Sequence, residues 1–512
     1  METNLSLVPL LAGSVSVFTL FTYSRRGASA TVFPRRHRNV CASSNLRFVG
    51  TNSLGKRSIA ISDAFDSGNI KVLDASNPKD IQLAIREEPL TKGTDKRKHF
   101  QWFYFRVSNV KNVDCRFRLT NAAKASFPEA WDGYEVVHSY NPSENHPQWL
   151  RIPNTKYTKP AADDDNENND TKMMKAVDPE LIWEFTSERD TVWFAYFAPF
   201  SYERHQALIA TAAKSALAET SVIGHTIGGK PMDLVKVGNG ERKVWIIARQ
   251  HPGESMAEWW MKGFITRLLA GEDKDSQKLR EGATVYLVPN MNPDGSVMGH
   301  LRTNRNGANL NREWQSGVYE GYDAPTLERS PEVFSVLEEM KKTGVDLFID
   351  VHGDEMIPDN FFVGGQGTPE WSQFLEDRYV LLNYAVLKST DEFQVGRGYG
   401  DPDDKDFKCI NSPPGEANLS VGSNHVGNRF KCVAATLEMP FKDTTKTAEK
   451  KKGWCPERAQ EFGASMISAF SLMLPYLRGE LGSAGEAMLK EAKEKTSASG
   501  KHWYTEGKKG RI

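Results

Sequence analysis

The sequence is poor in cysteine. Its five cysteines, at positions 41, 115, 409, 432 and 455 of 512 residues, are too few and too scattered for a disulfide framework. No C-x-x-C pair indicates a structural zinc knuckle. A protein from a reducing compartment is therefore expected.

An excess of charge of one sign is also missing. The 65 basic and 66 acidic side chains leave a net charge of -1, which gives no electrostatic reason to expect DNA, RNA or an anionic membrane as the main partner. Beyond residue 23 no uncharged run approaches the length of a membrane-spanning helix, so no stable membrane insertion of the mature protein is expected. The length of the chain and its 39% hydrophobic content predict two or three folded domains.

The first 62 residues contain a single acidic side chain, that of Glu2, while Arg and Lys are spread among many Ser and Thr. This bias is typical of a transit peptide and predicts a plastid or mitochondrial protein. Two alternatives remain open. Residues 5–23 are uncharged and long enough for a signal-anchor helix, whereas the Ser, Thr, Gly and Pro among them favour a disordered extension on a cytoplasmic protein.

Residues 63–200 predict an antiparallel β-sandwich domain. Aromatic and β-branched side chains alternate with polar ones in short runs, as in half-buried strands, with turn residues between the runs. The predicted strands are residues 99–107, 115–119, 184–186 and 191–197. The acidic and Asn-rich residues 163–170 predict a solvated loop.

Residues 201–478 predict an α/β domain, a mixed, largely parallel open sheet flanked by helices, because buried apolar strands now alternate with helical patterns. The predicted strands are residues 244–248, 284–289, 345–351 and 432–438, and the predicted helices are residues 202–217 and 255–269. Residues 479–512, rich in Lys, Glu, Ser and Gly, predict a loose polar tail.

Polar residues follow two of the buried strands. His251 and Glu254 come after residue 248, and His352 comes directly after residue 351. Ligands of open α/β sheets bind where the strands end, and two imidazoles with one carboxylate suit zinc while leaving a position for water. By itself each His has a more ordinary interpretation, as a capping or packing residue.

Three further features suit a hydrolytic site. Glu438 ends an apolar strand, where a carboxylate is costly to bury unless it has a task such as proton transfer. Arg312 with Asn311 can bind a terminal carboxylate in a bidentate fork, and Arg302 can steady an oxyanion. Separately, each Arg is typical of a surface ion pair.

Together and in this order, the motifs H-P-G-E, N-P-D-G and N-L-N-R, a strand ending in His and a strand ending in T-L-E closely resemble the M14 zinc carboxypeptidases. The β-sandwich and the spelling H-L-R-T-N-R-N-G-A-N-L-N-R-E-W resemble the cytosolic carboxypeptidase branch. The resemblance covers roughly residues 63–477.

This resemblance implies a zinc metallocarboxypeptidase with one zinc ion per chain, which hydrolyses C-terminal residues through a zinc-bound water. It assigns roles to the following residues: zinc ligands His251, Glu254 and His352, general base Glu438, carboxylate clamp Asn311 and Arg312, and carbonyl-polarising Arg302. The substrate-capping tyrosine of the digestive enzymes has no counterpart just before Glu438, where Asn424, His425 and Arg429 stand instead.

The branch is associated with the removal of glutamates from protein C-termini, which implies acidic peptide or protein C-termini as substrates. Arg429 or Lys431 would supply a basic pocket for them, although both also suit a solvent-facing position.

Three other functions compete with this one. Residues 253–257 follow a strand and open a helix, as in the nucleophile elbow of α/β-hydrolases, with Ser255 as nucleophile. An amidohydrolase of acyl amino acids would share the metal site. A non-catalytic binding module would recruit a partner through its β-sandwich, but it would not need Glu438.

Overall fold

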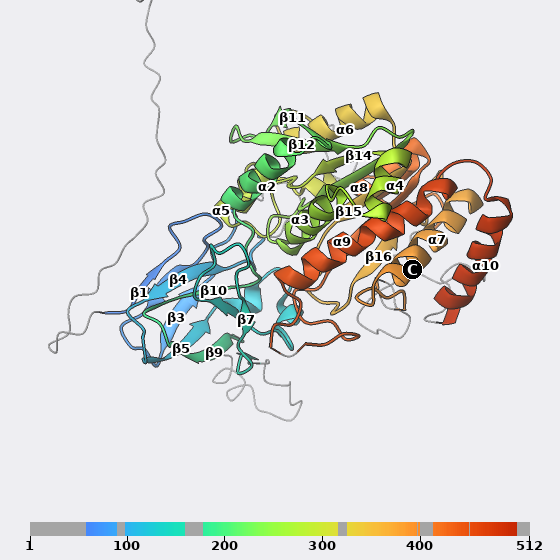
Figure 1. Cartoon of the computed structure of the whole chain (residues 1–512). Helices are drawn as coiled ribbons and strands as arrows, with labels where there is room; N and C mark the ends of the chain where they lie inside the picture. Colours follow the sequence, from blue (N-terminus) through green and yellow to red (C-terminus); the bar gives the residue numbers. More distant parts are fainter. Residues whose placement is uncertain are drawn as a thin grey trace, which may run out of the picture. The chain divides into compact units, whose positions relative to one another are not determined.

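Two β-sheets come from the N-terminal part of the chain, and a third sheet with flanking helices comes from the rest (Figure 1). We call these parts the N-terminal β region, residues 58–200, and the α/β region, residues 201–498. The computed structural model describes residues 58–89, 98–158, 178–315, 325–396, 398–399, 413–449 and 451–498.

The N-terminal β region is a sandwich of two five-stranded sheets. The first contains, in spatial order, β1 (Ala60–Ser62), β4 (Tyr104–Ser108), β10 (Thr191–Ala195), β6 (Val137–Ser139) and β7 (Leu150–Arg151). The second contains β2 (Lys71–Asp74), β3 (Ile81–Ala84), β5 (Asp114–Leu119), β9 (Leu181–Thr186) and β8 (Lys156–Tyr157). Among the described strands every pairing is antiparallel except that of β3 with β5.

Alternation along the strands builds the interior of this sandwich. Every second residue of β5 is buried, and the ring of its Phe117 lies 5.0 Å from that of Phe194 in the other sheet. Trp183 of β9 stacks on Phe117 at 5.2 Å. The aromatic side chains of this region are therefore core residues of two packed faces.

The predicted boundary at residue 62 was wrong. Ala60–Ser62 form β1 and pair with β4, so the first sheet begins inside the predicted extension. The predicted strand at 99–107 also starts too early, because β4 begins at Tyr104. Residues 1–57 and the predicted acidic loop at 163–170 lie outside the described residues.

The α/β region contains a seven-stranded mixed sheet. Its spatial order is β11 (Ala218–His225), β12 (Pro231–Val237), β14 (Ala283–Val288), β13 (Arg242–Ala248), β15 (Leu347–Val351), β17 (Val433–Glu438) and β16 (Phe361–Gly364). The four central strands, β14, β13, β15 and β17, are mutually parallel, and the remaining described pairings are antiparallel. All residues of β14, β15 and β17 are buried, as expected for strands covered on both faces.

Helices cover both faces of this sheet (Figure 1). Val244 and Ile246 of β13 belong to a core with α3 and α9, and the intervening Trp245 and Ile247 belong to a core with α6 and α8. The α-helices are α2 (Tyr202–Lys214), α3 (Met256–Leu268), α4 (Lys274–Gly282), α5 (Pro293–Met298), α6 (Pro331–Thr343), α7 (Gln373–Ser389), α8 (Gly422–Phe430), α9 (Pro456–Met473) and α10 (Gly482–Ala498). The short 3-10 helices are η1 (Ala122–Lys124), η2 (Pro128–Trp131), η3 (Leu310–Arg312) and η4 (Leu474–Tyr476).

The prediction of a loose tail from residue 479 was wrong for its first half. Gly482–Ala498 form α10, which packs against α7. Leu489 and Ala492 are buried in the main core, and Leu481 and Met488 pack against it. These apolar residues recur at helical spacing, and burial of this stripe outweighs the polar composition around it. Residues 499–512 lie outside the described residues.

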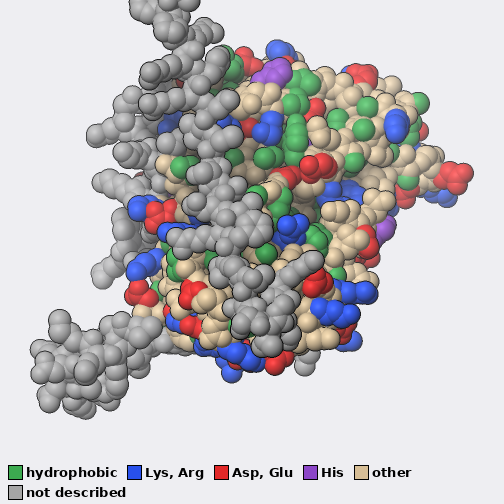
Figure 2. Space-filling model, turned by 90° about the vertical axis from the view of Figure 1, so that its left-hand side faces the viewer, with side chains coloured by type: hydrophobic (Ala, Val, Ile, Leu, Met, Phe, Trp, Pro, Cys, Tyr) green, Lys and Arg blue, Asp and Glu red, His purple; other side chains and the backbone are tan. Residues whose placement is uncertain are grey.

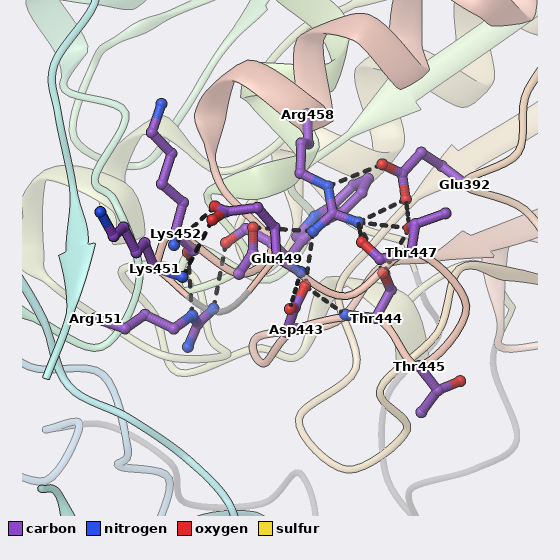
Figure 3. Close-up of polar contacts among 12 residues, drawn as sticks. Arg151, Glu392, Asp443, Thr444, Thr445, Thr447, Glu449, Lys451, Lys452 and Arg458 are labelled. Carbon is purple, nitrogen blue, oxygen red and sulfur yellow. Dashed lines mark hydrogen bonds and ion pairs between the residues drawn. The ribbon is translucent and has the colours of Figure 1, made fainter. Parts of the chain in front are cut away.

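The loop after β17 is held from two sides (Figure 3). Arg458 of α9 binds Asp443 at 2.7 Å and Glu392 through two nitrogens, at 2.8 and 2.7 Å. From the N-terminal β region, the buried Arg151 donates to the carbonyl oxygens of Phe441 at 2.9 Å and Trp454 at 3.2 Å. The two regions are thus joined through this loop.

The surface agrees with the balanced composition. On the face shown in Figure 2, Lys and Arg side chains are interspersed with Asp and Glu. None of the helices in the described part of the chain is long and apolar enough to span a bilayer.

Candidate active site

Three neighbouring parallel strands bring distant residues to one edge of the sheet. In the register, Ala248 of β13 pairs with Val351 of β15, and Val351 pairs with Leu437 of β17. The residues that follow each strand therefore leave the sheet side by side, as the carboxyl ends of parallel strands must. His251, His352 and Glu438 meet here, although 187 residues separate the first from the last (438 minus 251).

His251, Glu254 and His352 form the predicted metal-ligating group. Their candidate ligand atoms all lie within 4.8 Å of one another, and all three residues are buried. His251 Nδ1 is 2.6 Å from one carboxylate oxygen of Glu254, and His352 Nδ1 is 2.8 Å from the other. One cation placed among these atoms would contact two imidazole nitrogens and one carboxylate, a donor set that suits zinc.

The far nitrogens of both rings face fixed oxygen atoms. His251 Nε2 lies 3.0 Å from Asn309 Oδ1, and His352 Nε2 lies 3.0 Å from Asp350 Oδ1. Gln250 donates to the other oxygen of Asp350 at 2.5 Å. A ring that carries its proton on Nε2 presents the Nδ1 lone pair to the metal position, so these partners select the ligating tautomer.

Sequence reasoning missed Asn309 and Asp350. A signal for Asp350 was present, because it is a charged residue within the otherwise apolar strand β15, and a buried carboxylate needs a partner. Asn309 lies in the motif N-L-N-R, of which only the second Asn and the Arg received roles.

The surroundings shift the pKa values of the two imidazoles in opposite directions. Burial lowers the pKa of His251 to about 3 and keeps it neutral, as a metal ligand must be. Burial also acts on His352, but the neighbouring carboxylates of Asp350 and Glu254 outweigh it and raise the pKa of His352.

Glu438 lies beside this group with one oxygen held and the other free. The Tyr399 hydroxyl donates to Asp354 Oδ2 at 2.6 Å and lies 3.2 Å from Glu438 Oε1. Within the described residues, Glu438 Oε2 is buried without a hydrogen-bond partner. Burial raises the pKa of Glu438 well above its usual value, opposed by His352 and reinforced by Glu254. A carboxyl with a free oxygen beside the metal position can accept and return a proton.

Tyr399 is a third residue that sequence reasoning missed. It lies further from Glu438 in the chain than the stretch in which a tyrosine was sought, and no periodic pattern surrounds it. Only the folded structure brings its hydroxyl to Glu438.

Three of the other predicted residues border one cavity of about 440 Å³. Arg302, Asn311 and Arg312 all line it, together with His251, Glu254 and Glu438. Asn311 accepts a hydrogen bond from the Gly422 amide at 2.8 Å, which ties η3 to the start of α8. The cavity can therefore hold a carbonyl group near the metal position and an anionic group near Arg312.

The structure places Arg429 outside this cavity. Arg429 is exposed on α8 and does not line the cavity, whereas Ser423 and Asn424, at the start of the helix, do. Arg429 lies more than one turn further along, so its side chain leaves on another side of the helix. Lys431 is also directed away, because it forms an ion pair with Glu370 at 2.9 Å.

Ser255 does not behave as a nucleophile. It is fully buried, does not line the cavity, and donates its hydroxyl to the Ala198 carbonyl at 2.9 Å. The nucleophile-elbow alternative therefore has no support in the geometry.

Two family models match the chain. The cytosolic carboxypeptidase N-terminal domain matches residues 61–197, and the zinc carboxypeptidase model matches residues 205–389. Among curated proteins, an uncharacterised protein of Zymomonas mobilis is 38% identical over 82% of this chain and 97% of its own length. Cytosolic carboxypeptidase 2 of Danio rerio is 27% identical over 71% of this chain, which spans 48% of that relative. Cytosolic carboxypeptidase 3 of Bos taurus is 28% identical over 59% of this chain, which spans 30% of that relative.

Solved structures give the same picture. A putative carboxypeptidase A from Shewanella denitrificans is 41% identical, with a TM-score of 0.70 over 81% of this chain and 98% of its own. A metallo-carboxypeptidase from Pseudomonas aeruginosa, in complex with (2-guanidinoethylmercapto)succinic acid, is 38% identical, with a TM-score of 0.70 over 82% of this chain and 100% of its own.

Proposed function

The chain belongs to the M14 zinc carboxypeptidases and has the N-terminal domain of the cytosolic carboxypeptidases, and we propose that it removes C-terminal residues from peptides or proteins. One observation carries the proposal. His251 and Glu254 of the metal-ligating group line a single cavity with the buried Glu438 and two arginines, and the ligand atom of His352 lies within 4.8 Å of theirs. A binding module would not need the glutamate.

The metal-ligating residues and Glu438 have different roles in hydrolysis. Zinc held by His251, Glu254 and His352 would supply a Lewis acid that polarises the scissile carbonyl and lowers the pKa of an attacking water. Glu438, whose Oε1 faces the Tyr399 hydroxyl, takes the proton of that water through Oε2 and then delivers it to the leaving amine.

The two arginines act on different parts of the substrate. Arg312, beside Asn311, binds the terminal carboxylate and so selects the last peptide bond. Arg302 stabilises negative charge as it develops on the carbonyl oxygen.

Glutamate is one candidate for the residue removed, on the strength of the branch resemblance. The two residues expected to attract it, Arg429 and Lys431, lie away from the cavity. Among the described lining residues, the cationic side chains are those of Arg302 and Arg312, and both have other tasks in this mechanism.

A cationic C-terminal residue is the second candidate, and the lining favours it. Asp354, Glu355 and Glu376 border the cavity. Burial raises the pKa of Asp354 and Glu355, and a cationic group beside them would stabilise their charged forms. The Pseudomonas aeruginosa protein was crystallised with a compound that combines a guanidine group with a dicarboxylic acid, a chemistry that this lining would also suit.

A peptide panel tests the proposal. Purified full-length protein loaded with zinc is incubated with peptides that differ only in a C-terminal Glu, Leu or Lys, and mass spectrometry follows the products. We expect loss of one terminal residue, and little cleavage once the terminus is amidated, because Arg312 then loses its anionic partner. Equal cleavage of amidated peptides contradicts the exopeptidase assignment, and cleavage of acyl amino acids alone supports the amidohydrolase.

Two variants assign the roles in the same assay. Glu438→Gln should lower turnover by about 10²–10⁴-fold, because a proton shuttle is lost, while zinc content stays unchanged. Arg312→Ala should retain zinc and lose its discrimination between free and amidated termini. Full activity of the first variant would exclude Glu438 as the general base.

A further inference from the structure

We propose that Glu88, in the N-terminal β region, is a positioning residue for catalysis, which fixes the backbone that carries Arg302. The inference rests on the role assigned to Arg302 in the proposed function. It gives the N-terminal β region a direct part in the active site, beyond covering the α/β region.

The carboxylate of Glu88 is surrounded by donors from one short segment of the α/β region. Oε1 accepts from the backbone amides of Leu301 and Arg302, both at 2.7 Å, and Oε2 accepts from the Thr303 amide at 3.0 Å. The Thr303 hydroxyl also donates to Oε2. Glu88 is 6% exposed, so these charge-assisted hydrogen bonds form away from bulk water.

Arg302 depends on this support. Arg302 lines the cavity, and its guanidinium attracts the carboxylate of Glu355. Within the described part of the chain, no side chain lies within hydrogen-bond or ion-pair distance of this guanidinium. A long side chain without such anchors takes its position from its backbone, and the backbone of residues 301–303 is what Glu88 holds. Because Glu88 forms no ion pair with the guanidinium, it acts on Arg302 through the main chain.

The same segment is tied to the metal-ligating turn. The Gly253 amide, between His251 and Glu254, donates to the Leu301 carbonyl at 2.9 Å. A Cβ at Gly253 would lie 3.0 Å from that oxygen, so the two backbones are in close contact. Leu301 thus links Glu88 on one side to the metal-ligating turn on the other.

Further hydrogen bonds join the N-terminal β region to the residues just before this segment. The Ser67 amide donates to the Val297 carbonyl at 3.0 Å, and the Asn69 side chain donates to the Gly299 carbonyl at 3.2 Å. Gly299 has a positive φ of 68°, and a Cβ there would lie 2.9 Å from the Ser67 carbonyl oxygen. Residues 297–303 therefore take their shape against the N-terminal β region.

Glu88→Gln tests the proposal in the full-length, zinc-loaded protein. The amide would turn an NH2 group toward backbone N–H donors, so about half of the hydrogen bonds would be lost. We expect kcat to fall by tenfold or more with KM within about twofold, because stabilisation of an oxyanion acts in the transition state. Zinc content should be unchanged.

Glu180→Gln is the matched control. Glu180 is also a buried carboxylate of the N-terminal β region, 8% exposed, but both of its oxygens bind Arg118, at 2.6 and 2.7 Å. This variant should keep the kcat of the wild type. An equal loss in both variants would mean that Glu88 has only a general structural role, which overturns the proposal.

A double-variant cycle shows whether Glu88 acts through Arg302. In the Arg302→Ala background, Glu88→Gln should lower kcat by less than about twofold, because the group that it positions is gone. Multiplied effects of the two changes, or a folded Glu88→Gln protein with normal kcat, would overturn the proposal. If the wild type cleaves no peptide, the proposed function fails first and separately.

If Glu88→Gln does not fold well enough to be assayed, a milder variant tests the same contact. Thr303→Val removes one donor to Glu88 Oε2 and leaves the carboxylate in place. We expect a several-fold loss of kcat and faster hydrogen exchange of the amides at residues 301–303. Unchanged kcat and exchange in this variant would likewise contradict the proposal.

Discussion

At the scale of single residues, His205 lies buried between two carboxylates. It is 1% exposed on α2, and its two ring nitrogens lie 2.7 Å from Glu258 and 3.1 Å from Asp233. Glu258 also accepts from Arg249 at 2.7 Å, close to the metal-ligating turn. Burial by itself lowers the pKa of His205, but the two carboxylates outweigh it and raise the pKa to about 9.

His205→Gln should therefore change the pH dependence of stability. A histidine whose pKa is raised in the folded state adds stability that is fully present below its unfolded pKa of about 6.5 and is lost as pH rises through about 9. A pKa difference of this size corresponds to at most about 3 kcal/mol. Urea unfolding should show a larger gap between wild type and variant at pH 6 than at pH 10.

His225→Gln is the control for this prediction, because His225 is exposed at the end of β11. Its effect on the free energy of unfolding should be small and independent of pH. A gap between wild type and His205→Gln that stays constant from pH 6 to pH 10 would contradict a protonated His205.

At the scale of elements, a glycine in each of α3 and α9 faces the backbone of the other helix and allows a close approach. A Cβ at Gly263 of α3 would lie 1.9 Å from the carbonyl oxygen of Gln460, and a Cβ at Gly463 of α9 would lie 2.0 Å from that of Trp260. Both obstacles are backbone atoms, which have no rotamer to change. The two helices approach each other as closely as they do because neither position has a side chain.

Gly463→Ala should force these helices apart. Insertion of a methyl group against fixed backbone in a packed core costs about 1–3 kcal/mol of folding free energy or more. Urea unfolding should show this loss as a lower midpoint. Gly271→Ala is the control, because nothing lies within 4 Å of a Cβ at Gly271, and equal stability of the two variants would contradict the close approach.

At the scale of the whole molecule, the metal-ligating group joins segments that are far apart in the chain. His251 follows β13 and His352 follows β15, and the ligand atoms converge only when the central sheet has formed. An ion that binds the folded chain and not the unfolded one stabilises the fold.

Removal of zinc should therefore lower the melting temperature as well as the activity. With free zinc at about 1,000 times its dissociation constant, the linkage contributes about 4 kcal/mol. Thermal unfolding before and after chelation, and after zinc is added back, measures this contribution. The His352→Ala variant should respond far less to zinc, and a wild type that melts at one temperature with and without zinc would contradict the metal site.

Much of the architecture could be predicted from local patterns. The continuous apolar runs of β13, β14, β15 and β17 marked the centre of the sheet, because strands covered on both faces have no polar side. Patterns were less informative at the edges. The predicted extension overlapped β1, because a strand of three residues gives only a short pattern. The predicted tail included α10, because the few apolar residues of this helix are surrounded by polar ones.

The sequence by itself determined which residues meet at the metal position, since side chains that follow adjacent parallel strands must leave the sheet at one edge. Only the tertiary structure decided that Tyr399 and Glu88 support this site and that Arg429 lies outside it. These three positions depend on loops and on the contact between two regions. Their geometry arises from packing between distant segments, and no periodic pattern in the chain encodes it.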